Sequence, residues 1–117
     1  MSDRSTLSQF GHVFQSKIIS SLLSDKKFIQ TISDILEYEY FDSDANKWIC
    51  KEIRDYFFEY KTIPTLEVMK VKIDDMENEV LQVSVVDNLK ESWRNVKSTD
   101  LKFVQEQTLE FCKNQVM

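Results

Sequence analysis

Residues 44–60 read DANKWICKEIRDYFFEY, and the apolar side chains of this segment recur in steps of three and four residues. That spacing is the period of an α-helix with one wide buried face. Ser43 can cap such a helix, and Pro64 holds Ile63 out of the helical region after it. We therefore predict the most deeply buried helix of the fold over residues 44–60. Its buried face would carry Ala45, Trp48, Ile49, Ile53, Tyr56, Phe57 and Tyr60.

The same spacing predicts helices on both sides of this segment. Two come before it, over residues 8–23 and 26–37, and Asp25 can cap the second. Residues 38–41 hold three aromatic rings and form a joint that is expected to be buried. After Pro64, Thr65 can cap a short helix over residues 66–75. Gly11 has no evident role in this pattern.

Two further helices follow, one after the acidic residues 74–79 and one beginning at Leu101. Only residues 97–100 break the pattern between them, which predicts an antiparallel hairpin. Val83 and Val86 lie off the main apolar stripe of the first of these helices. At an expected length of about 17 to 20 residues each, the two helices would carry surplus apolar surface for a partner, unless both pack on the first four helices.

The sequence therefore predicts an all-α fold: a compact bundle of about four helices over residues 1–75, then an antiparallel helical hairpin over residues 76–117. A single Gly and a single Pro among 117 residues agree with this class. Phosphate-binding Walker loops and dinucleotide fingerprints need several glycines, so neither is present. An all-β fold with many tight turns is excluded on the same ground.

The net charge of −5 is spread over both halves of the chain without a basic stripe. We therefore expect protein partners rather than direct binding of nucleic acid. No apolar run is long enough to span a membrane, and the N-terminal residues lack the apolar core of a signal peptide, so a cytoplasmic protein is expected. Cys50 and Cys112 are far apart in sequence and are expected to be reduced, partly buried thiols.

Candidate sites of chemistry are few. Residues 42–46, Asp-Ser-Asp-Ala-Asn, match the first, third and fifth ligands of a calcium loop. Lys47 occupies the position that needs glycine, and Ile53 the position that needs a bidentate glutamate, so a helix N-terminus explains these residues better. His12 is the only histidine, which excludes a histidine-based zinc cluster or triad. We therefore predict no catalytic, metal-binding or nucleotide-binding residues and no cofactor.

Residues 14–73 contain five segments in a fixed order: an apolar helix ending in Leu-Leu-x-Asp (18–25), a helix that starts with an aromatic residue and ends in Ile-Leu (28–36), a Phe-containing joint (40–41), a long helix (46–60) and a Pro-x-Leu opening (63–66). In this order and spacing they resemble the N-terminal domain of DnaB-type replicative DNA helicases. The amino-acid sequences of residues 41–49 and 103–115 are similar to those of helicases of T4-like bacteriophages. Bacterial members often carry His-Arg where this chain has Asn46-Lys47, and a glycine shortly before the proline, where it has residues 61–63.

The resemblance implies a scaffold and oligomerisation domain of a hexameric helicase that unwinds DNA at the replication fork. Its helical hairpins would pair neighbouring subunits into dimers, and three dimers would form the ring that receives the primase in the primosome. ATP and Mg would bind only to the RecA-like ATPase domain of the parent protein. That domain is expected beyond Met117, where the chain stops inside a helical pattern. The residues expected at the subunit contact are Leu89, Trp93, Val104 and Phe111.

Two other functions stay open at this point. The first is a stand-alone acidic helical adaptor of a bacteriophage that binds another protein, with no motor attached. The second is an acidic single-strand binder, in which aromatic side chains would stack on bases. The aromatic residues lie at core spacing and the chain has no basic stripe, which disfavours the second function.

Overall fold

The computed structural model describes residues 6–115, and every regular element in that range is helical. The α-helices are α1 (Gly11–Ser24), α2 (Lys26–Ile32), α3 (Asp44–Tyr60), α4 (Leu66–Asp74), α5 (Glu79–Arg94) and α6 (Leu101–Gln115). Short 3-10 turns, η1 (Leu7–Phe10) and η2 (Tyr38–Tyr40), precede α1 and α3. The predicted all-α class is confirmed. No helix of this part of the chain is long and apolar enough to cross a membrane.

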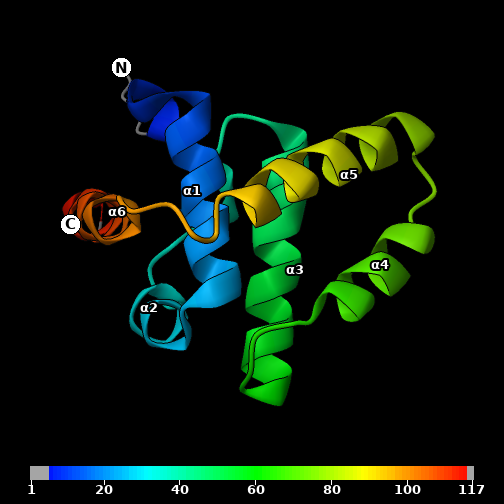
Figure 1. Ribbon diagram of the computed structural model, residues 1–117, viewed down its shortest axis with the longest axis horizontal. Helices are drawn as coiled ribbons and strands as arrows, with labels where there is room; N and C mark the ends of the chain where they lie inside the picture. Colours follow the sequence, from blue (N-terminus) through cyan, green and yellow to red (C-terminus); the bar gives the residue numbers. More distant parts are fainter. Residues whose placement is uncertain (1–5, 116–117) are drawn as a thin grey trace.

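Helix α1 is the centre of the fold. It packs against α3 and α5 and, on another side, against α6, while α2 folds back on it directly. Figure 1 shows α6 and α3 on opposite sides of α1, with α5 crossing α1 and α3. Fully buried residues from α1, α2 and α3 form one core with those of α5 and α6, so the core is continuous across residues 75 and 76.

The prediction that the last two helices form an antiparallel hairpin is wrong. Helix α5 packs on α1 and α3, and α6 packs on α1, but α5 and α6 do not pack along each other. The connection between Arg94 and Leu101 carries the chain across α1, as Figure 1 shows. Both helices therefore pack on the first four helices of this chain, which is the alternative that the sequence left open. With 16 and 15 residues, each helix is about 24 Å long, shorter than the smallest dimension of the molecule, 28 Å.

The predicted helix starts are confirmed at three caps. The Asp25 carboxylate accepts from the amides of Lys27 and Phe28, Ser43 Oγ accepts from the amide of Asn46, and Thr65 Oγ1 accepts from the amide of Val68. Each cap satisfies a backbone donor that the first turn of a helix leaves free. Local side-chain chemistry thus sets where α2, α3 and α4 begin.

Three details differ from the sequence prediction. Helix α2 ends at Ile32 rather than at residue 37, and Leu36 reaches the core from the turn that follows. Tyr60, placed on the buried face, is 58% exposed because it lies at the end of α3. Gly11 adopts φ 85° and ψ 173° where η1 passes into α1, a conformation that essentially only glycine tolerates. Its role is therefore to let the chain turn into α1.

Lys61 ends α3 in the left-handed conformation, with φ 61° and ψ 27°. A side chain costs free energy there, and glycine is the usual residue at this position. We expect Lys61→Gly to raise the free energy of unfolding by about 1 kcal/mol. Urea denaturation followed by circular dichroism measures it. As a control, Glu59→Gly in the last turn of α3 is expected to lower the free energy of unfolding by a similar amount. A lower free energy of unfolding for Lys61→Gly would contradict the prediction.

Candidate functional site

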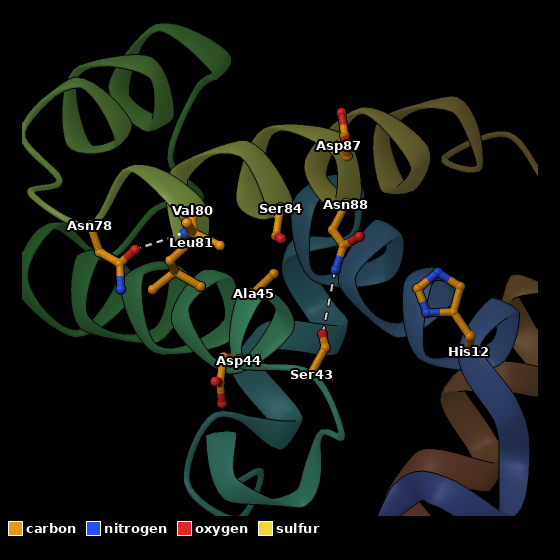
Figure 2. A pocket seen from close by; sticks show the side chains of 10 residues that line it. All are labelled: His12, Ser43, Asp44, Ala45, Asn78, Val80, Leu81, Ser84, Asp87 and Asn88. Carbon is orange, nitrogen blue, oxygen red and sulfur yellow. Dashed lines mark hydrogen bonds between the residues drawn. The ribbon is translucent and has the colours of Figure 1, made fainter.

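A hollow of about 520 Å³ lies between the first turns of α1 and α3 and the side of α5 from Asn78 to Asn88. Figure 2 shows its side chains, which are mostly short and polar. Asn88 Nδ2 lies 3.4 Å from Ser43 Oγ, and Asn78 Oδ1 accepts from the Leu81 amide at 3.0 Å. The lining residues are His12, Ser43, Asp44, Ala45, Asn78, Val80, Leu81, Ser84, Asp87 and Asn88.

The titratable side chains of this hollow do not converge on a common point. In Figure 2 the Asp44 carboxylate and the Asp87 carboxylate point away from each other, and His12 stands apart from both. His12 Nε2 is instead 3.1 Å from Glu91 Oε1, on α5. Within residues 6–115 no three His, Cys, Asp or Glu side chains gather as metal ligands would. Two of the polar side chains of this hollow act as helix caps, Ser43 for α3 and Asn78 for α5.

The residues of the calcium-like segment have structural partners. Asp42 accepts hydrogen bonds from Ser8 Oγ and from Gln15 Nε2, the latter at 3.0 Å. These two bonds, that of Ser8 first, lower the pKa of the Asp42 carboxyl against the opposing effect of burial. Ser43 caps α3, and Asn46 is buried beneath Asn88. The segment therefore joins the N-terminal turn, α1 and α3.

Gln15 is the functional side chain of this region that the sequence prediction missed. It is 1% exposed and bonds to η1, to α1 and to residue 42. A glutamine within an apolar helical stripe, four residues after the lone Gly11, was the available signal, since a buried amide needs several partners.

The two cysteines are buried and unbonded. Burial raises the pKa of both the Cys50 and the Cys112 thiol to about 12. Since the thiolate is the reactive form, we expect both to react with a disulfide reagent at pH 8 about a thousandfold more slowly than an ordinary thiol with a pKa near 8.5. The rates at which the reagent modifies the native and the denatured protein are compared by absorbance. Rapid modification of either thiol in the native protein would contradict this burial.

The residues predicted at the subunit contact fall into two groups. Leu89, Val104 and Phe111 are only 5%, 2% and 6% exposed, because the core of this chain itself covers them. Trp93 is 42% exposed at the end of α5. The structure therefore does not bring the four together on one surface, and only Trp93 has appreciable area available to a partner.

Trp93 borders a second hollow, a groove of about 310 Å³ between α4 and α5. We call it the α4–α5 groove. Its apolar walls are formed by Leu66 and Ile73 of α4 and by Val86, Leu89 and Trp93 of α5. Val86 lies off the main apolar stripe of its helix, and that offset was the only sign of this groove in the sequence.

Comparison with protein-family models, curated proteins and solved structures gives no match to this chain.

Proposed function

We propose that this chain is a protein-binding scaffold domain, without catalytic activity of its own, from the N-terminal part of a DnaB-type replicative helicase. The observation that carries the proposal is the order of the family-like segments over residues 14–73. Leu-Leu-x-Asp ends α1 and supplies the Asp25 cap of α2, and Pro-x-Leu leads into α4 at Leu66.

The chemistry of the described residues agrees with a scaffold. The polar hollow has no convergent reactive groups, and the thiols are buried with a raised pKa. The acidic net charge also favours protein partners over direct contact with DNA phosphates. In the proposed parent, ATP and Mg would be held by a separate motor domain, and this domain would contribute to the ring and to primase binding.

The gene provides the first test. We expect the reading frame to continue past Met117 into a glycine-rich Walker loop. A stop codon there would overturn the helicase assignment and leave the stand-alone adaptor.

Sedimentation provides the second test. The full product of the gene, mixed with the primase of the same genome, is expected to form a hexamer that cosediments with primase. Deletion of residues 1–117 should abolish the primase interaction while ATP hydrolysis by the motor remains. Unchanged primase binding after the deletion would overturn the proposed role of this domain.

A further inference from the structure

The α4–α5 groove is open beside the first residue of α4, because the contacts that hold this helix lie at its middle and at its C-terminal end. Met69 and Ile73 of α4 are buried, whereas Leu66 is 37% exposed. Gln82 Nε2 donates to the Ile73 carbonyl at 2.8 Å, which ties the end of α4 to α5. Lys72 Nζ lies 3.1 Å from Glu52 Oε1, which ties α4 to α3. Figure 1 shows α4 set apart from α1 and α3, and Trp93 on the α5 side of the groove is 42% exposed.

The groove has the dimensions of a short helix-binding site. Helix α4, with nine residues, is about 13 Å long, which matches two to three turns of a bound helix. Its apolar walls suit side chains spaced at i, i+4 and i+7 on one face of a partner helix. Trp93, at one end, is the kind of large aromatic residue that dominates the binding free energy of such interfaces.

The charges at the groove differ from those of the chain as a whole. Lys70 of α4 and Lys90 of α5 line it from both walls, and Asp74 stands at the last turn of α4. Neither lysine forms an ion pair with a carboxylate of residues 6–115. On a chain with net charge −5, this groove is therefore locally basic and apolar at once. The complementary partner is an amphipathic helix whose apolar face is flanked by carboxylates.

We propose that the α4–α5 groove binds an amphipathic helix of another protein that carries glutamate or aspartate beside its apolar face. The partner's apolar side chains lie between Leu66, Val86 and Trp93, and its carboxylates pair with Lys70 and Lys90. This inference does not depend on the helicase assignment, because it rests only on the shape and charge of the groove.

The test uses two synthetic helical peptides of about 18 residues with leucines at i, i+4, i+7 and i+11. Glutamates flank the leucines in one peptide and lysines in the other. The protein carries Trp48→Phe, so that emission reports Trp93 alone. We expect the glutamate peptide to shift this emission to shorter wavelength and to bind roughly 10-fold more tightly than the lysine peptide, with a difference that shrinks as salt is added.

Reversing the two lysine charges of the groove distinguishes peptide binding there from general electrostatic attraction between peptide and protein. The double variant Lys70→Glu/Lys90→Glu is expected to reverse the order of the two peptides. Its matched control, Lys102→Glu/Lys113→Glu on α6, changes the net charge equally and is expected to leave the order unchanged. Equal affinity for both peptides, no shift with either, or reversal in the control as well would overturn the proposal.

The same Trp93 emission distinguishes two other occupants of the α4–α5 groove. A shift of equal size with an oligo-dT strand at low salt would mean that the groove takes single-stranded nucleic acid. A concentration-dependent shift without peptide, accompanied by a dimer in sedimentation that Trp93→Asp abolishes, would mean that a second copy fills it. Either result would overturn the proposal, whereas failure of primase binding would leave it unaffected.

Discussion

Phe111→Asp is expected to unfold most of the protein. The Phe111 ring is 6% exposed, and it meets the rings of Phe10 and Tyr40 edge to face, with centroids 6.1 and 5.3 Å away. Removing a buried phenylalanine costs about 3 to 5 kcal/mol, and an unpaired carboxylate in its place adds a desolvation penalty. The sum is comparable with the whole stability of a domain, about 5 to 15 kcal/mol. The loss of helical circular dichroism at 25 °C measures it.

Trp93→Asp is the comparison that makes this result informative. Trp93 is 42% exposed, so the same replacement is expected to leave the helical signal intact and to cost about 1 kcal/mol in urea denaturation. The resemblance to helicases placed both residues at a subunit contact. If Phe111→Asp remained helical and instead lowered the mass in sedimentation, Phe111 would be a subunit contact, and the packing of α6 on α1 would be contradicted.

The starts of α2, α3 and α4 were predictable from sequence because local capping side chains set them. Helix α3 begins after Ser43 and ends before Pro64, as expected, since a cap and a residue held out of the helical region act on their immediate neighbours. Gly11 and Lys61 show the limit of this reasoning. Both have positive φ, and nothing in the surrounding sequence indicates which residues adopt it.

The position of α5 could not be predicted, because the residues of α1 that it packs against include polar serines. Ser16 and Ser20 of α1 are fully buried, and Ser20 Oγ donates to the Ser16 and Ser92 carbonyls. A row of serines reads as the solvated face of an amphipathic helix, whereas here the small side chains lie buried where α1 packs against α5. The apolar pattern thus identified one buried face of α1 and missed a second.

The candidate sites were harder to predict than the helices, for a related reason. The α4–α5 groove depends on the separation of two helices, and no motif of the sequence covers both of its walls. Conversely, residues 42–46 match part of a calcium-loop motif, but the Asp42 carboxylate there accepts hydrogen bonds from Ser8 and Gln15. Sequence patterns report local geometry well, whereas a groove is a property of the packing between elements.

Gln15→Leu is expected to lower the free energy of unfolding by about 2 to 4 kcal/mol although it keeps the side-chain volume. Gln15 Nε2 reaches the Leu7 and Gly11 carbonyls, both at 3.2 Å, and Gln15 Oε1 accepts from the Asp42 amide at 3.0 Å. Leucine removes all of these bonds and leaves the part-buried Asp42 amide without its acceptor, which costs more than that bond itself contributes. Urea denaturation at pH 7 measures the loss. Gln82→Leu, which removes a single bond to the Ile73 carbonyl, is the matched control at about 1 kcal/mol.

Acid titration gives the Gln15 prediction an independent measurement. Hydrogen bonds from Ser8 and Gln15 lower the pKa of the native Asp42 carboxyl, so its contribution to stability is present above the ordinary pKa near 3.9 and is lost as the pH falls through the lowered value. In Gln15→Leu the Asp42 pKa is expected to rise toward the ordinary value, because one of the two donors is gone. Carboxyl carbon NMR follows this residue directly. An unchanged Asp42 pKa together with unchanged stability would mean that Gln15 does not join the N-terminal turn to α3.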